Sequence, residues 1–223
     1  MPVELDHIFV CASPGGEEAR ALAEFGLSEG TPNVHAGQGT ACRRFFFRNG
    51  YLELLWVTDP GEAQSATTRP THLCERWNAR GTDASPFGLG FRPSAQVQCS
   101  VPFPSWEYRP PYLPESLSFH VGTNASVLKE PMLFYLPFSR RPDSDSAPRR
   151  QVVEHAAGLR ELTRVELISP HVDSLSTAFE ALLSTGVIRR RAGAGQLVEL
   201  GFDGESKGRM TDFRPGLPIV FSW

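Results

Sequence analysis

The chain has 223 residues, of which 40% are hydrophobic and 21% are charged. These fractions are typical of a folded globular protein and exclude an intrinsically disordered chain. The formal net charge is −3, so the basic surface of a nucleic-acid-binding protein is not expected.

The four cysteines stand apart in the sequence and form no C-x-x-C pair, which removes the usual spacing of a structural zinc site. The first residues, MPVELDHIFV, lack the basic start of a signal peptide, and no long apolar run follows that could span a membrane. We therefore expect a cytoplasmic protein without membrane contact, with four free thiols and no disulfide.

The first elements are a strand, a helix and a second strand. Val3–Val10 is apolar on both faces apart from its acidic residues, which predicts a largely buried strand. Ser13-Pro14 has the pattern of a helix start, and Gly26 has that of a helix end. Thr31–Ala36 predicts another short strand.

A hairpin follows. Ala41–Arg48 and Tyr51–Val57 both have the composition of strands, and Asn49-Gly50 stands between them. This dipeptide favours the tight turn that joins two antiparallel strands.

The middle of the chain is irregular and rich in proline and aromatic residues. A polar connection, with a short helix expected around Thr71–Asn78, leads into it. The strands expected in the middle segment are Phe87–Arg92, Ser116–Gly122 and Met132–Pro137. Arg140–Pro148 then has the composition of an exposed linker.

The C-terminal part repeats the opening order. Leu162–Ile168 predicts a strand, Ser169-Pro170 a helix start and Gly186 a helix end. The strands expected after this helix are Gln196–Phe202, Gly208–Phe213 and Leu217–Trp223. The pair LDHIFV…SPGGEEARALAEFG and LTRVELISPHVDSLSTAFEALLSTG is therefore a weak internal repeat, which indicates that one supersecondary unit was used twice.

The phrases LDHIFV and NGYLELLWV, which flank the first helix, resemble the opening module of the vicinal oxygen chelate superfamily, the group of glyoxalases, bleomycin-resistance proteins and dioxygenases. MLFYLPF and GRMTDFRPGLPIVFSW also look like strand endings of its glyoxalase-like domains. The resemblance implies an α+β fold, in which repeated βαβββ modules form curled mixed sheets around a central cavity, with an irregular Pro-rich middle segment.

On this basis we expect a first βαβββ module over 1–60, a connection over 61–85, a β-rich middle segment over 86–139, a linker over 140–159 and a C-terminal βαβββ module over 160–223.

The resemblance also implies a site for a divalent metal such as Fe, Mn, Ni, Co or Zn. The family's first-strand histidine corresponds to His7, and its fourth-strand glutamate, a metal ligand and the expected catalytic residue, corresponds to Glu53. His120 is the best candidate for a third ligand. The family's remaining ligands are missing, because Arg164 stands where a second histidine would be and the last strands carry no acid.

Alternatives remain open at these positions. His7 is also compatible with a core histidine, and Glu53 with a partner of Arg164 in an anion-binding pocket that needs no metal. Trp106 and Tyr108 are expected to line this pocket or cover it as substrate-binding residues. The histidines expected to be solvated are His35, His72, His155 and His171.

Two classes of function fit these residues. One is a metal-dependent lyase, isomerase or dioxygenase that acts on a small oxygenated metabolite. The alternative is a metal-free protein that binds or sequesters a small molecule; a homodimer is compatible with both. The sequence carries no nucleophile motif and no phosphate-binding loop, and Gly88 and Gly90 lack the third glycine and the helix of a dinucleotide site.

Overall fold

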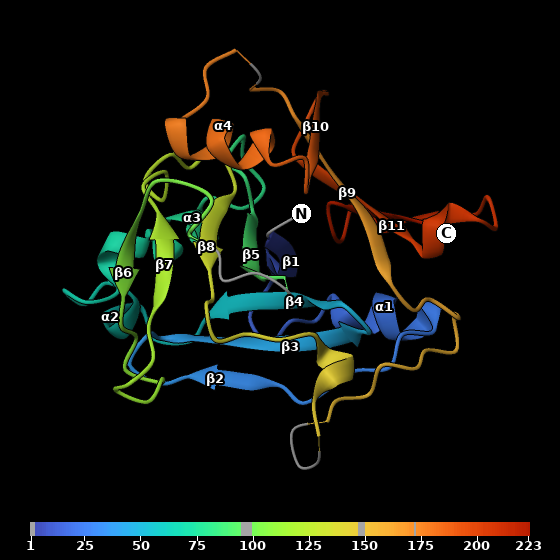
Figure 1. Ribbon diagram of the computed structural model, residues 1–223, viewed down its shortest axis with the longest axis horizontal. Helices are drawn as coiled ribbons and strands as arrows, with labels where there is room; N and C mark the ends of the chain where they lie inside the picture. Colours follow the sequence, from blue (N-terminus) through green and yellow to red (C-terminus); the bar gives the residue numbers. More distant parts are fainter. Residues whose placement is uncertain (1–2, 95–99, 147–149, 172) are drawn as a thin grey trace.

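The computed structural model describes residues 3–94, 100–146, 150–171 and 173–223, which form a large sheet of eight strands and a smaller sheet of five. Figure 1 shows how the large sheet curls: β2 to β4 run across the view, whereas β6 to β8 run up it. Few helices accompany the sheets, so the expected α+β class with curled mixed sheets is confirmed.

The first half of the large sheet has the strand order β2-β3-β4-β1. Its strands are β1 (Val3–Cys11), β2 (Asn33–His35), β3 (Thr40–Phe47) and β4 (Gly50–Val57). β3 and β4 are the antiparallel hairpin expected from Asn49-Gly50, and β4 lies parallel to β1. A parallel neighbour requires a crossover connection, and this one contains α1 (Ala19–Phe25).

The second half repeats this arrangement as β5-β8-β7-β6. Its strands are β5 (Phe87–Pro93), β6 (Ser105–Tyr108), β7 (Phe119–Gly122) and β8 (Met132–Tyr135). β5 is parallel to β8, as β1 is to β4, and the antiparallel pair of β1 and β5 joins the halves. The middle segment is therefore the partner of the first module in this sheet.

The smaller sheet has the order β10-β9-β11-β13-β12. Its elements are β9 (Leu162–Ser169), α4 (Thr177–Ser184), β10 (Arg189–Ala192), β11 (Leu197–Phe202), β12 (Met210–Asp212) and β13 (Ile219–Ser222). β9 pairs with β10 and β11, whereas β1 pairs with the last strand of its module. The expectation that residues 160–223 match the first module strand for strand is wrong, because a similar local pattern does not determine which strands pair.

Both long helices begin later than the sequence pattern predicts. α1 begins at Ala19 because Gly15 and Gly16 adopt positive φ angles of 80° and 61°, which a right-handed helix cannot contain. α4 begins after Ser176, whose side chain accepts a hydrogen bond from the Phe179 N–H. The helix end at Gly26 is confirmed by its left-handed conformation.

The remaining helical segments are short. They are α2 (Pro60–Ala63), α3 (Leu73–Asn78) and the 3₁₀ turns Arg69–Thr71, Pro142–Ser144 and Asp203–Glu205. α3 confirms the short helix expected in the polar connection. No described helix is long and apolar enough to cross a membrane.

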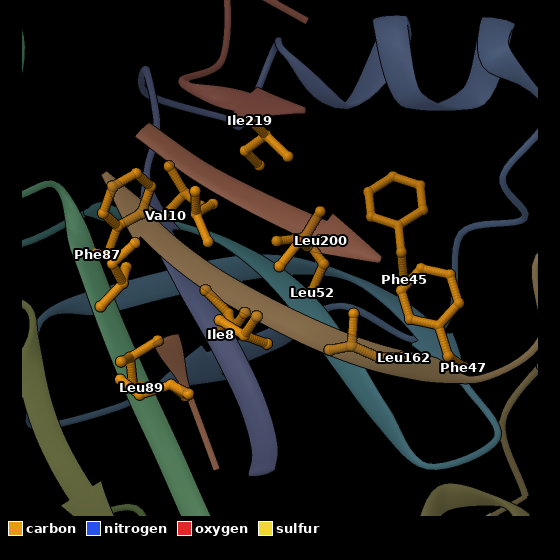
Figure 2. Packing of buried hydrophobic residues seen from close by; sticks show 14 of the residues in the cluster. Ile8, Val10, Phe45, Phe47, Leu52, Phe87, Leu89, Leu162, Leu200 and Ile219 are labelled. Atoms are coloured by element: carbon orange, nitrogen blue, oxygen red, sulfur yellow. The ribbon is translucent and has the colours of Figure 1, made fainter. Parts of the chain in front are cut away.

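The main core fills the space between the two sheets. Figure 2 shows side chains of β1, β3, β4 and β5 pointing toward β9, β11 and β13, among them Ile8 and Leu52 on one side and Leu200 and Ile219 on the other. Because strand side chains alternate between faces, the neighbours of Ile8 and Leu52 along their strands point away from this core. Those neighbours face the concave side of the large sheet.

Candidate functional site

A cavity of about 270 Å³ lies on the concave face of the large sheet, near the lower end of the size range of ligand pockets. Both halves of the sheet line it, with different chemistry. The charged and imidazole side chains of its wall are Asp6, His7, His35, Arg44 and Glu53, and all of them come from the first half. β7 and β8 of the second half contribute Phe119, Met132 and Phe134 instead.

Asp6 and His7 reach the cavity together although they are adjacent in β1. A register shift between Leu5 and His7 in the pairing with β5 makes this possible, since such irregularities re-aim side chains. The Nδ1 atom of His7 lies 2.6 Å from Oδ1 of Asp6, and its ring stacks on Tyr51 with 4.2 Å between ring centroids. The histidine is thus fixed in orientation on two sides.

The Asp6 carboxylate is held by further donors. Arg92 donates from Nη1 to Oδ2 over 3.3 Å, and the Ser139 hydroxyl donates to the same oxygen. Burial alone would raise the pKa of Asp6, but the hydrogen bond from His7 and the charges of His7 and Arg92 outweigh it and hold the pKa below its ordinary value. Asp6 is therefore a carboxylate, which accepts the Nδ1 proton of His7.

Glu53 lies beside the other ring nitrogen of His7. Its Oε2 atom is 3.6 Å from His7 Nε2, and its side chain is buried. Across the β3–β4 ladder Glu53 is paired in register with Arg44. Arg44 donates from Nε to the Thr31 carbonyl oxygen over 2.8 Å and forms no ion pair with a carboxylate among the described residues. The cavity therefore offers a cation on the same sheet face as Glu53, without an ion pair between the two among the described residues.

A second group meets at Glu53. One ring nitrogen of His35, the Cys42 thiol and one Glu53 oxygen lie within 4.8 Å of one another, and all three residues are buried. Burial lowers the pKa of His35 and, with the nearby Glu53 charge, raises that of Cys42. Imidazole, thiol and carboxylate are the donors that divalent transition metals prefer in proteins, so these three residues fit such an ion.

The structure brings together only some of the site residues predicted from the sequence. His7, Glu53 and Tyr108 all line the cavity. Their roles in binding or catalysis stay predictions. Trp106 packs against the apolar cluster behind Tyr108, with 5.7 Å between the ring centroids, and does not line the cavity.

His120 and Arg164 lie elsewhere. His120 falls between Phe119 and Val121 in β7, whose side chains belong to the concave cluster, so strand alternation turns His120 to the other face. Arg164 is in the smaller sheet and pairs with Glu205 over 2.6 Å. The alternative in which Arg164 pairs with Glu53 is therefore wrong, because Arg164 lies in the other sheet and pairs with Glu205.

Two histidines expected in solvent are buried. His35 lies in a strand of only three residues, too short to give a periodic signal. His155 accepts a hydrogen bond from the Ser28 N–H at Nδ1 and donates from Nε2 to the Phe46 carbonyl oxygen. Cys42 carried no sequence signal either, since an isolated cysteine matches no metal motif. The described cysteines Cys11, Cys42 and Cys74 are free, as expected, and Cys99 lies outside the described residues.

Gly88 and Gly90, which did not fit a nucleotide motif, make room on the concave face. A Cβ atom at Gly88 would lie 2.0 Å from the Phe9 ring, and one at Gly90 would lie 2.5 Å from the Phe134 ring and 3.1 Å from His7 Cε1. Glycine in a strand interior commonly marks such a close approach. Because Gly88 and Gly90 have no side chains, β5 leaves room for the rings of Phe9 and Phe134 and for His7.

The chain has matches among solved structures and protein-family models. No curated protein matches the chain. Among solved structures, a hypothetical protein from Staphylococcus aureus is similar over 100% of this chain and 99% of its own, with 12% sequence identity and a TM-score of 0.48. Residues 5–92 match the model of the glyoxalase-like domain, and this match spans β1 to β5. Over these residues the chain is therefore similar to a glyoxalase-like domain, the domain type of the vicinal oxygen chelate superfamily.

Proposed function

We propose that the cavity binds a small carboxylate that carries an adjacent hydroxyl or carbonyl oxygen and an apolar body, and that the protein catalyses proton transfer on this molecule as an isomerase or lyase. The observation that carries the proposal is the division of the cavity wall. Oriented acid–base groups and a cation stand on one half, and aromatic and aliphatic side chains stand on the other.

Each end of the ligand has a matching surface. Arg44 would pair with the carboxylate, because this residue lines the cavity and its guanidinium has no carboxylate partner among the described residues. Phe119, Met132 and Phe134 suit the apolar body. At about 270 Å³ the cavity suits a metabolite rather than a large cofactor.

His7 is the group placed for proton transfer. With its Nδ1–H donated to Asp6, a neutral His7 would carry its lone pair on Nε2, on the side of Glu53. Nε2 would take a proton from the carbon beside the carbonyl group, so that the C–H electron pair forms the C=C bond of an enolate and the carbonyl π pair moves to oxygen. It would then return a proton to the same carbon as the carbonyl group re-forms. A divalent metal bound at Glu53 would supply a Lewis acid for the two ligand oxygens.

The test combines binding with isotope exchange. A series of 2-hydroxy and 2-oxo acids with aliphatic or aromatic bodies is titrated calorimetrically into the full chain, and bound acids are followed by proton NMR in D₂O. We expect binding and exchange of the proton beside the carbonyl group. His7→Gln should abolish exchange but retain binding, Arg44→Met should weaken binding, and His120→Gln, outside the cavity, should change neither.

Failure of every acid in the series to bind would overturn the proposal. Binding without exchange would favour the second candidate, a protein that sequesters its ligand. One observation supports that candidate: among the described residues, the second half of the sheet places no carboxylate or imidazole on the cavity wall. The proposal also includes a homodimer located in the cytoplasm. Analytical ultracentrifugation of the full chain would measure the mass of the dimer.

A further inference from the structure

We infer that His35, Cys42 and Glu53 form a binding site for a thiophilic divalent metal, of the zinc and cobalt class, built within the first half of the large sheet. This site goes beyond the proposed function, which names Glu53 but no other residue as a metal ligand, and its formation requires no organic ligand. It also differs from the arrangement that the family resemblance implies, which combines His7 and Glu53 with ligands from a second module.

The strand register places the three side chains in one diagonal row. His35 is paired with Thr40 in the β2–β3 ladder, two residues before Cys42. Cys42 is paired with Leu55 in the β3–β4 ladder, two residues after Glu53. Diagonal neighbours on one face of a sheet lie within reach of each other. Their ligand atoms accordingly lie within 4.8 Å of one another.

The Glu53 carboxylate supports a bound cation. It is only 4% exposed, and among the described residues no lysine or arginine forms an ion pair with it. Its nearest basic group is His7 Nε2, at 3.6 Å. A buried carboxylate is costly unless it meets a positive charge or donors. A divalent ion between Glu53, Cys42 and His35 would offset this cost.

The His35 ring is oriented by a hydrogen-bond partner at one nitrogen, as metal-binding histidines usually are. Its Nδ1 atom lies 2.9 Å from the Thr40 hydroxyl, which also accepts a hydrogen bond from the Gln38 amide. The Tyr108 hydroxyl in turn donates to the Gln38 carbonyl oxygen. The Thr40 oxygen can accept from both neighbours, so His35 can donate its Nδ1 proton and keep a lone pair on Nε2. Such supporting contacts fix ligand orientation and tune metal affinity.

The donor set selects the class of metal. Magnesium, calcium and manganese favour oxygen ligands, whereas a thiolate with an imidazole and a carboxylate suits zinc and cobalt. Three protein ligands also leave one position of a tetrahedral ion open, which is the pattern of catalytic zinc sites. The cavity lies on the same face as these ligands, so the open position is available to a small molecule.

The test is a metal titration of the full chain after removal of metal with a chelator. Cobalt should produce tetrahedral visible bands and a thiolate-to-cobalt charge-transfer band in the near ultraviolet, and stoichiometric zinc should abolish both. Cys42→Ser should remove the charge-transfer band. Cys74→Ser, a matched change at a buried thiol outside the group, should retain it. Thr40→Val should weaken zinc binding by about 10–100-fold.

Absence of the charge-transfer band in the wild-type chain would overturn the inference, whether or not the variants fold. Persistence of the band in a folded Cys42→Ser variant would also overturn it. Magnesium should neither displace cobalt nor raise the melting temperature, whereas zinc should raise it. Because this titration contains no organic ligand, its outcome is independent of whether the proposed acids bind or exchange protons.

Discussion

The two halves of the large sheet share one strand order, yet they present different surfaces to the cavity. On the first half, β1 to β4 carry Asp6, His7, Glu53 and the partners of Glu53. On the second half, the corresponding concave positions of β5 and β8 carry glycine, methionine and phenylalanine. A duplicated scaffold has thus been divided into a reactive wall and an apolar wall.

One residue departs from this division. Arg92 lies at the end of β5 in the second half, and it donates to Asp6 and, over 2.8 Å, to the Asn49 carbonyl oxygen. Arg92 therefore supports Asp6 from behind without lining the cavity. The predictions below test how strongly each half depends on the other.

Arg92→Met should have the largest effect. Arg92 and Asp6 are each 2% exposed, so removal of the guanidinium leaves a buried carboxylate without its cation. We expect a loss of about 3–5 kcal/mol in the free energy of unfolding, measured by urea denaturation. The control is Arg109→Met, since the Arg109–Glu107 pair is exposed and its removal should change the free energy of unfolding far less. Equal losses in the two variants would contradict this account.

Gly88→Ala should have the next largest effect. The added methyl group would meet the Phe9 ring, which packs over β5 on the concave face. Overpacking of this kind costs about 1–3 kcal/mol, again measured by urea denaturation. Gly195→Ala is the matched change, because a Cβ atom there meets nothing within 4 Å. A neutral Gly88→Ala variant would show that the aromatic wall adapts freely.

Sequence reasoning succeeded where the fold depends on local pattern. The hairpin at Asn49-Gly50, β1 and the end of α1 at Gly26 were all readable from a few adjacent residues. The sequence pattern did not show that β5 to β8 are the partner of the first module. Strand pairing is non-local, and the described part of the second half has no helix between β5 and β6 that would mark a repeated module. The C-terminal segment resembled a repeat only in the order of its elements.

The candidate site was predicted in part for a similar reason. His7 and Glu53 lie in strands with clear periodicity and with a family resemblance, and both reach the cavity. His35 and Cys42 become neighbours of Glu53 only through the register of two ladders. A sequence without known pairing cannot supply that register. The prediction for Arg164 failed in the opposite way. The apparent repeat suggested that Arg164 lies near Glu53, but the strands that carry the two residues do not pair.

Tyr108→Phe should test the contact between the halves with a smaller effect. Tyr108 belongs to β6, but its hydroxyl donates to the Gln38 carbonyl oxygen in the first half over 3.1 Å. Loss of this buried hydrogen bond should cost about 1 kcal/mol in urea denaturation. Tyr112→Phe is the control, since the described contact of Tyr112 is ring packing on His35. An equal cost in both variants would argue against a specific role for the Tyr108 hydroxyl.

The smallest effect should come from protonation of His155, which attaches the chain leading to the smaller sheet to the first half. Burial lowers the pKa of His155, although the Phe46 carbonyl and Glu154 oppose this shift. The folded state therefore takes up the proton less readily than the unfolded state, whose histidine pKa is about 6.5. The contribution to stability is complete above that pH and is lost as the pH falls from about 6.5 through the folded pKa. Protonation of Nδ1 also breaks the hydrogen bond that it accepts from the Ser28 N–H.

The measurement is the difference in unfolding free energy between wild type and His155→Gln from pH 7.5 to 5, in which the titrations of His35 and Asp6 cancel. That difference should shrink as the pH falls, and parallel curves for the two proteins would contradict the assignment.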